Sequence, residues 1–328
     1  MVDHTNTYNR TNMKKSLIIA LLAVFTLSLQ AQKQVAPENT LALRVLVEEP
    51  IEPAPPASKQ LIENKLNALL TQNGVASMDY LGQFFITARA LPMSKDIIAG
   101  PPTKISETME VAFYIADYYN QVVFSTTSAT VKGIGETESK CYLNALKQLK
   151  LNTPQMQQFV DEGKKKIIAY YNSQADKLIA QAQTLSKTKN YEQALWIIST
   201  IPAECDKYNE ALKVGIDIYQ EYIDHTCNVN LAQARTAWAS DQNALGATAA
   251  GEYLSQILPD AKCYGDAMDL YKEIKGKVLD DWKFEMKKYD DTIDLERRRI
   301  DATRQVGVAY GTHQPNQTTS IEFLRTLL

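Results

Sequence analysis

The sequence predicts an α+β protein, in which a small antiparallel sheet with two helices is followed by an all-α helical-hairpin domain and a long C-terminal helix. Between residues 40 and 132, short stretches of alternating apolar residues are separated by proline and glycine. From 154 to 309, apolar residues instead recur every three or four positions. The 328 residues are 45% hydrophobic and 22% charged, which is typical of folded domains with proper cores. We expect an α+β domain over 39–151, a helical array over 154–309 and a tail over 310–328.

The N-terminus has the three-part layout of a secretory signal peptide over residues 13–31. Two lysines precede an apolar run over 17–29, and a small residue closes the segment. We expect cleavage between Ala31 and Gln32, with residues 1–12 as an extension or an upstream mis-start. A retained membrane anchor is the alternative, although the run is short for a membrane span. The sequence therefore predicts an exported protein in the periplasm, at the outer membrane or secreted, with no stable membrane span after cleavage.

The predicted sheet begins with a half-buried strand over residues 40–48, where aliphatic side chains occupy alternate positions. A proline-rich stretch ends this strand because proline cannot continue the ladder. A helix follows over 58–72 with an apolar face, and Gly74 provides its C-terminal stop. The order of strand and helix is the first half of the predicted α+β domain.

Three more strands and a helix complete this domain. We predict a strand over 82–91, then two longer strands over 105–118 and 122–132. The last two strands meet across the short turn at 119–121 and should form an antiparallel hairpin. A helix over 136–149 then closes the unit. Sheet and helices together make a small layered sandwich.

One step in this domain resembles a known type of domain. A strand ends at Gly133-Ile134-Gly135, and Glu136-Thr137-Glu138-Ser139 opens a helix that contains Tyr142, Ala145 and Leu146. This step is similar to the strand-glycine-helix step of small α/β domains in bacterial envelope proteins. They include the TolB amino-terminal domain, curli secretion-channel subunits and flagellar-assembly lipoproteins. The resemblance covers about residues 40–150 and implies a periplasmic assembly or interaction module.

The helical part contains a predicted helix-turn-helix between residues 175 and 202. Asn190 is expected to cap the second helix, and Pro202 stops it. Small and large residues alternate on the two helices in an order that resembles a tetratricopeptide helix pair. The residues that carry this resemblance are Leu178, Ala182, Leu185, Tyr191 and Ala194. It covers about one repeat, and Ile198 and Ile201 depart from the family pattern. A second stretch, 258–267, echoes residues 201–211, which indicates some internal repetition.

Export changes the interpretation of the four cysteines, because an even set can pair in an oxidising compartment. Helices predicted over 228–240 and 244–258 have similar lengths, so the hairpin returns to its starting point. Cys227 and Cys263 flank its open end, and a bridge between them would stabilise the hairpin by about 3–4 kcal/mol. The two remaining cysteines are either paired across the domain junction or buried singly. These are Cys141 and Cys205.

The C-terminal region from Tyr264 to Val308 is predicted as one long amphipathic helix or two helices end to end. Beyond Asp290 the apolar residues thin out among charges. This distal part is a candidate arm for partner binding or homo-oligomer formation, or a terminal helix lying on its own domain. The tail ends in apolar residues that invite a docking partner or fold back on the array. They are Ile321, Phe323, Leu324, Leu327 and Leu328.

No catalytic, cofactor or metal site is predicted. Gly133-x-Gly135 lacks the third glycine of a dinucleotide loop and favours a plain tight turn. His225 lies near Cys227, but the expected disulfide uses that thiol. Neither the spacing of the cysteines nor the three histidines fits a metal site. Acidic residues between 280 and 296 are expected to pair with neighbouring basic residues on a helix surface. The acidic residues are Asp280, Asp281, Asp290, Asp291, Asp294 and Glu296.

The expected function is a non-enzymatic scaffold of the bacterial cell envelope that holds other envelope proteins in an assembly. The formal net charge is -3, and basic runs at 164–166 and 297–299 have acidic neighbours, so nucleic acid is not an expected partner. One alternative is a glycan- or peptidoglycan-binding module that uses surface tyrosines such as Tyr118 or Tyr119. A hydrolase is another alternative, and it would require two carboxylates in one pocket.

Overall fold

The computed structural model describes residues 41–50, 54–76, 82–279, 282–289 and 294–313. These residues form a four-stranded sheet with helices, followed by a mostly helical region, which confirms the α+β class. The predicted extension, the signal peptide, its cleavage site at Ala31 and the end of the tail lie outside the described residues.

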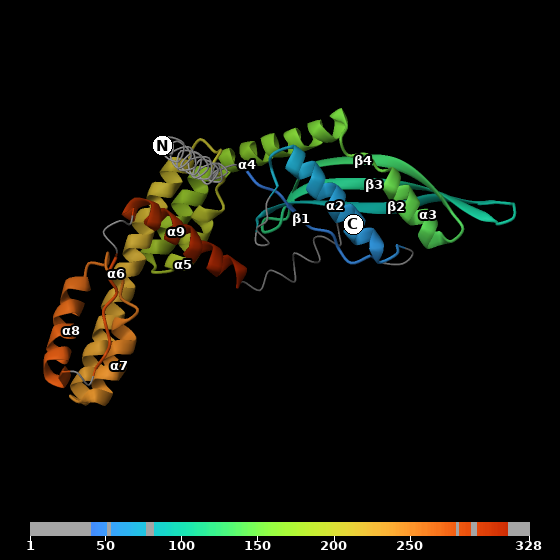
Figure 1. The fold of residues 1–328 in the computed structure, drawn as a ribbon. Helices are drawn as coiled ribbons and strands as arrows, with labels where there is room; N and C mark the ends of the chain where they lie inside the picture. Colours follow the sequence, from blue (N-terminus) through green and yellow to red (C-terminus); the bar gives the residue numbers. More distant parts are fainter. Residues whose placement is uncertain (1–40, 51–53, 77–81, 280–281, 290–293, 314–328) are drawn as a thin grey trace, which may run out of the picture. The chain divides into compact units, whose positions relative to one another are not determined.

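The sheet has the strand order β1-β2-β3-β4, shown in Figure 1. Its strands are β1 (Arg44–Val45), β2 (Phe84–Ile98), β3 (Lys104–Asp117) and β4 (Val122–Gly135). The last three form an antiparallel meander, in which β3 and β4 are the predicted hairpin. β1 pairs in parallel with β2, so the sheet is mixed and not purely antiparallel. The reason is that a helix on one face connects β1 to β2, and such a crossover returns the chain in the same direction.

β2 is longer than the strand predicted over residues 82–91. It continues to Ile98 because the register shifts between Pro92 and Ser94, which accommodates the proline within a strand. Beyond this irregularity, pairing with β3 resumes and ends at Ile98 opposite Lys104. The predicted strand therefore ended too early, at Leu91.

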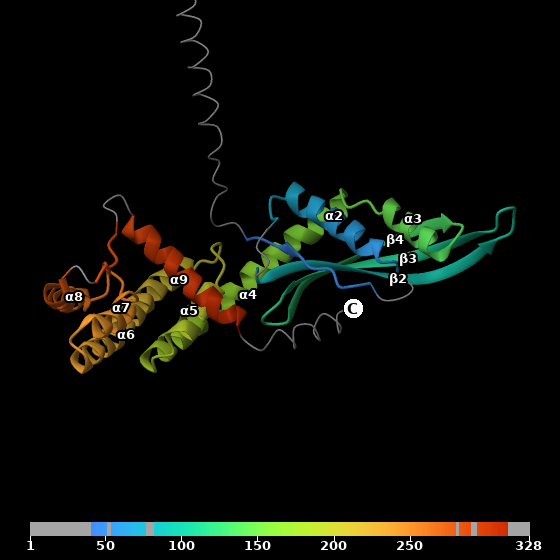
Figure 2. The ribbon, with the colours of Figure 1, turned by 60° about the horizontal axis from the view of Figure 1, so that its bottom comes forward.

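Three helices cover one face of the sheet (Figures 1 and 2). They are α2 (Ala57–Gln72), α3 (Glu138–Gln148) and the first part of α4 (Pro154–Lys187). α2 and α3 match the predicted helices closely. Thr153 caps α4 by accepting a hydrogen bond from the Met156 N–H, with Pro154 in the first turn. Phe159 of α4 then packs on Phe113 of β3 in the shared core.

The remaining helices are α5 (Tyr191–Ser199), α6 (Tyr208–Ser240), α7 (Ala244–Leu254), α8 (Tyr264–Val278) and α9 (Leu295–Thr312). Helix α5 packs between α4 and α6, and α7 packs between α6 and α8. The helices predicted over 175–188 and 228–240 are the second halves of the long helices α4 and α6. The helix predicted over 244–258 ends at Leu254.

The turn between α4 and α5 differs from the prediction. Asn190 occupies the N-cap position of α5, but its side chain makes no capping bond and donates instead to the Thr188 hydroxyl. Lys189 adopts a φ of 63°, and the N–H of Asn190 bonds back to the Leu185 carbonyl. The turn is therefore fixed by the left-handed end of α4 and not by a cap on α5.

The similarity between residues 201–211 and 258–267 corresponds to a repeated pattern of backbone hydrogen bonds. In the connector after α5, the Cys205 N–H bonds to the Pro202 carbonyl and the Tyr208 N–H to the Cys205 carbonyl. The connector after α7 repeats this pattern, since Ala261 bonds to Leu258 and Tyr264 bonds to Ala261. A side chain of the preceding long helix also holds each connector. The acceptors are Asn172 for the Asp206 N–H, at 2.9 Å, and Asp224 for the Lys262 N–H, at 2.8 Å.

The region after α8 is neither one long helix nor two helices end to end. Leu279 adopts a φ of 53° at the end of α8, and residues 282–289 have no helical structure. Trp282 and Met286 are buried and Phe284 is half-buried, whereas Lys283 and Glu285 between them are exposed. This alternation is typical of an extended segment. The same apolar residues also fit a four-residue spacing, which is why a helix was predicted.

The candidate C-terminal arm lies on its own domain. Helix α9 packs against α5 and α6, and its buried residues are Thr303, Gly307 and Gly311. A Cβ atom at Gly307 would lie 2.6 Å from the Leu195 carbonyl oxygen, so the missing side chain permits close approach of the two backbones. The apolar residues thin out in α9 because small residues make its contact surface, not because it leaves the core.

Candidate interaction surface

The distal half of β2 forms an exposed edge, which we define as residues Leu91–Ile98. All eight residues are exposed, whereas the first five residues of β2 are buried. Ile97 is 74% exposed and Met93 is 62% exposed. Figure 2 shows this part of β2 running alongside β3, away from β1. Apolar side chains at this level of exposure are typical of interaction sites.

The backbone of the exposed edge is also available. β1 pairs only with Phe85 and Ile86, so no described strand pairs with the outer side of residues 91–98. From Ser94 to Ile98 the register with β3 is regular, so the backbone groups of this part alternate as in an ordinary strand. An unpaired strand edge of this kind can receive an extended segment of another chain.

The opposite edge of the sheet is blocked by side chains of the covering helices. Gln155 of α4 donates to the Ser128 carbonyl at 3.3 Å and to the Thr127 hydroxyl at 3.0 Å. Asn144 of α3 donates to the Ile134 carbonyl at 2.9 Å. These bonds occupy carbonyl groups of β4 that a partner strand would need. The two edges of the sheet therefore differ, and the β2 edge is the better site for strand addition.

The exposed edge carries two charged residues, the ion-paired Lys95 and the exposed Asp96. Lys95 forms an ion pair with Glu138 at the start of α3. Opposite Lys95, the Glu107 side chain is buried, and this desolvation raises its carboxyl pKa, partly offset by the charge of Lys95. Burial likewise raises the pKa of the nearby Cys141 thiol, so this thiol is not an activated nucleophile. The surface is suited to binding by shape and backbone pairing.

A buried polar cluster connects the sheet to the helical region. Asp117, at the end of β3, is fully buried and accepts a hydrogen bond of 2.5 Å from the Tyr171 hydroxyl of α4. It also accepts bonds of 2.9 Å from the side chains of Gln83 and Asn120. Burial, followed by the Asp117 charge, raises the pKa of Tyr171 far above its usual value. Because these groups satisfy one another, we interpret the cluster as structural.

The tyrosines considered for glycan binding lie beside this cluster. Tyr118 packs edge-on against Phe85, and the Arg44 guanidinium lies 4.7 Å from the centre of its ring. Tyr119 packs against Trp196 of α5 with 4.6 Å between ring centres. Both tyrosines are half-buried. Their rings therefore contribute to packing between the sheet and α5, and they do not form an exposed aromatic platform.

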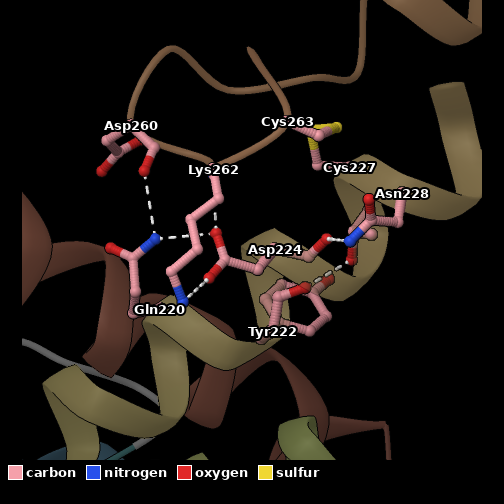
Figure 3. The surroundings of a disulfide bond; sticks show 9 residues. Gln220, Tyr222, Asp224, Cys227, Asn228, Asp260, Lys262 and Cys263 are labelled. Carbon is pink, nitrogen blue, oxygen red and sulfur yellow. Dashed lines mark hydrogen bonds and ion pairs between the residues drawn. A yellow bond between two sulfur atoms is a disulfide. The ribbon is translucent and has the colours of Figure 1, made fainter. Parts of the chain in front are cut away.

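The structure contains the predicted disulfide between Cys227 of α6 and Cys263 at the start of α8 (Figure 3). The two Cα atoms lie 6.1 Å apart, within the usual range for a bridge. Cys141 and Cys205 do not pair, and both are buried. Cys141 lies between α3 and β4, where its thiol bonds to the Gly133 carbonyl, whereas Cys205 lies near the Ile168 carbonyl of α4. The two free cysteines are therefore buried at separate sites, which agrees with the second of the two expected alternatives.

Polar contacts around the disulfide reinforce the same connector. Asp224 accepts bonds from the Lys262 backbone and the Gln220 side chain, and it pairs with the Lys262 ammonium group at 2.8 Å (Figure 3). Asp260 accepts a bond of 2.7 Å from the Tyr289 hydroxyl and pairs with Arg299 of α9 at 3.4 Å. The connector between α7 and α8 is therefore tied to α6, to the extended segment and to α9.

We expect Asp224→Asn to lower the free energy of unfolding by about 1 kcal/mol at neutral pH. Burial opposes ionisation, but hydrogen bonds from Lys262 and Gln220 outweigh it and lower the Asp224 pKa. A lowered pKa stabilises the fold above the ordinary value of 3.8, and this stabilisation disappears as the pH falls through the native pKa. Urea unfolding at neutral and acid pH measures the effect. Lys262→Ala keeps the backbone hydrogen bond to Asp224 and should lower the free energy of unfolding by less. If Asp224→Asn lowered this free energy equally at neutral and acid pH, the stabilising role of the ionised Asp224 would be contradicted.

The other residues considered as sites have structural roles. A Cβ at Gly133 would meet the Ala145 backbone nitrogen at 2.5 Å, so this glycine permits close packing of α3 on β4. The His225 ring packs beside Tyr191. Asp294 caps α9 by accepting bonds from the N–H groups of Glu296 and Arg297. Glu296 is exposed in the first turn of α9, and the other four acidic positions lie outside the described residues, namely Asp280, Asp281, Asp290 and Asp291.

Comparisons with protein-family models, curated proteins and solved structures give no match for this chain. Within the described ranges, no helix is both long and apolar enough to span a membrane. No group of three or more histidine, cysteine, aspartate or glutamate side chains in those ranges is arranged to hold a metal ion. The exposed β2 edge was missed by the sequence analysis, although Ile97 and Ile98 before the Gly100-Pro101-Pro102 break are typical of a strand end.

Proposed function

We propose that this chain is an exported, non-enzymatic interaction protein of the bacterial cell envelope. The observation that carries the proposal is the exposed edge of β2, where Leu91–Ile98 present apolar side chains and an unpaired backbone side among the described residues. The partner is another envelope protein with an extended segment, because strand addition needs backbone groups and short apolar pockets and no reactive residue. A second copy of this chain is also compatible with this binding mode.

The helical region supports a scaffold role. Its two repeated connectors join helices that pack as the helix pairs of a tetratricopeptide-like array would. In such an array, each hairpin buries its apolar face against the next. The disulfide and the Asp260 contacts fix the second of these connectors. A rigid array of this kind would keep bound proteins at a constant separation from the sheet.

Two features support export. The N-terminal sequence has the layout of a signal peptide. The Cys227–Cys263 disulfide is consistent with an oxidising compartment outside the cytoplasm. Together they favour the periplasm, the outer-membrane surface or the medium as the place where the exposed edge meets its partner.

The proposal predicts that Met93→Lys and Ile97→Lys, combined in one chain, lower recovery of the main cross-linked partner about tenfold, which corresponds to the loss of about 1.4 kcal/mol of binding free energy. Lysine on an edge strand discourages strand addition, and both side chains are already exposed, so the fold should remain intact. Cross-linking in the native host, followed by mass spectrometry, measures the recovery.

Leu245→Lys is the matched control, because Leu245 is 78% exposed but lies on α7. Its cross-links should match those of the unchanged chain. Sedimentation of the purified protein tests whether a second copy is the partner. Equal recovery of partners by the edge variant and the control, or recovery of free monomer alone from the unchanged chain, would reject the proposed function.

A further inference from the structure

The sheet has a second apolar surface on the face opposite the helices, which we call the open face. Phe85 of β2 and Ala116 of β3 form its centre, surrounded by Leu46, Tyr118 and Val123. This cluster is separate from the main core, and no described helix contributes to it. The open face of a small antiparallel sheet usually carries polar side chains. Here its end next to β1 is apolar.

Burial indicates that this part of the open face is covered. Phe85 and Thr87 are both 0% exposed, and Thr87 lies opposite the half-buried Tyr114 on β3. The Thr87 hydroxyl has no hydrogen-bond partner among the described residues. A threonine on a solvated sheet face would bond to water, and buried hydroxyl groups are normally satisfied. The face is therefore more enclosed than its described neighbours explain.

The end of α9 lies close to this face. Gly311, in the last turn of α9, packs against the Trp196 ring. From Trp196, three ring contacts lead to the open face, with centre distances of 4.6 Å to Tyr119, 5.5 Å from there to Tyr118 and 6.3 Å to Phe85. The segment 314–328 follows directly. Fifteen extended residues span roughly 50 Å, so this segment is long enough to reach the face.

The composition of this segment matches the surface. Residues 314–320 are polar apart from Pro315 and form a spacer. Residues 321–328 contain five apolar side chains, and their two charged residues are Glu322 and Arg325. The apolar side chains of this segment therefore match the apolar part of the open face.

We propose that residues 321–328 dock on the open face of the sheet, over Phe85 and Thr87, as an intramolecular cover. The sheet then has the α2, α3 and α4 layer on one face and the C-terminal segment on the other. This inference does not depend on the exposed edge of β2, because that edge and the cover concern different residues of the sheet.

A photo-cross-linking experiment on the full chain tests this inference. Tyr114, which is half-buried on the open face, is replaced by p-benzoylphenylalanine, and the irradiated monomer is digested and analysed by mass spectrometry. The expected product joins position 114 to a peptide from 321–328 of the same chain. Phe323→Asp should lower its yield about tenfold, because a carboxylate is costly to bury against apolar groups. Thr318→Asp, in the spacer, is the matched control and should leave the yield unchanged.

Mixing isotopically light and heavy protein separates intramolecular from intermolecular products. A light–heavy product would show that a second copy occupies the face and would overturn the proposal. It would also be overturned by cross-links to another segment, by no cross-link at all, or by a yield that Phe323→Asp leaves unchanged. Circular dichroism of each variant confirms that the sheet is intact, so that a lost product reports on docking and not on unfolding.

Discussion

Replacing Gly133 by alanine is expected to lower the free energy of unfolding by more than about 3 kcal/mol. A Cβ at this position would overlap the Cys141 carbonyl oxygen and lie 2.5 Å from the Ala145 nitrogen. Both are backbone atoms of α3, so the overlap is relieved only if the helix moves away from β4. That movement would also open the packing of Ala145 and Leu146, which are fully buried. Urea unfolding followed by circular dichroism measures the loss.

Gly276→Ala is the matched control for this prediction. Gly276 lies within α8, and nothing lies within 4 Å of a Cβ added there. Alanine should therefore increase stability by about 0.5–1 kcal/mol, through the higher helix propensity of alanine. A Gly133→Ala variant as stable as the Gly276→Ala variant would show that α3 does not pack on β4 as closely as described.

The main helices and strands could be predicted because their periodicities are unambiguous. Leu66, Leu69 and Leu70 in α2 recur at helical spacing, and Phe113 and Ile115 in β3 alternate with half-buried residues. The disulfide could be predicted because similar helix lengths bring Cys227 and Cys263 back together. These inferences depend on local sequence and need no knowledge of distant contacts.

The features that were missed depend on tertiary packing. Apolar periodicity reveals the buried face of a helix only when that face carries apolar side chains. The buried face of α9 instead consists of small residues, namely Thr303, Gly307 and Gly311. Trp282 and Met286 satisfy both a helical and an alternating pattern, so only the positive φ of Leu279 separates the two interpretations. The direction of strand pairing could not be predicted from local sequence either, because the parallel alignment of β1 with β2 follows from the position of α2.

The candidate interaction surface was missed for a related reason. The exposure of Met93 and Ile97 depends on whether the covering helices extend over the distal half of β2. The local sequence around β2 does not show how far those helices extend. The register shift after Pro92 lets the strand continue to Ile98, and this shift depends on pairing with β3. The apolar residues of the surface can be seen in the sequence. Where the helix layer over the sheet ends, and so leaves them exposed, cannot.

The two helical repeats differ at the positions of the disulfide, and this difference can be tested. In the second repeat, Cys227 follows Asp224 by one helical turn and Cys263 follows Lys262 directly. The corresponding positions of the first repeat, after Asn172 and Asp206, are Ala175 and Lys207. Ala175 is buried, and Lys207 pairs instead with the neighbouring Asp176. The same connector is thus held covalently in one repeat and by an exposed ion pair in the other.

Removing the disulfide with Cys227→Ala and Cys263→Ala should lower the free energy of unfolding by about 3–4 kcal/mol, because the bridge closes a loop with a sequence separation of 36 residues. The loss arises mainly from the greater freedom of the unfolded chain in the chain-entropy model. Thermal and urea unfolding, each with and without a reducing agent, measure it. Reduction should destabilise the unchanged protein by a similar amount and should leave the double variant unaffected.

Cys205→Ala is the control for loss of a buried thiol, and its stability should still fall on reduction. A counterpart variant with Ala175→Cys and Lys207→Cys should form a second bridge under oxidising conditions, because the repeated hydrogen bonds place these residues as they place Cys227 and Cys263. Peptide mapping without reduction detects it. If that bridge fails to form, the two connectors are not geometrically equivalent. If reduction leaves the unchanged protein as stable as before, the disulfide contributes nothing to the array.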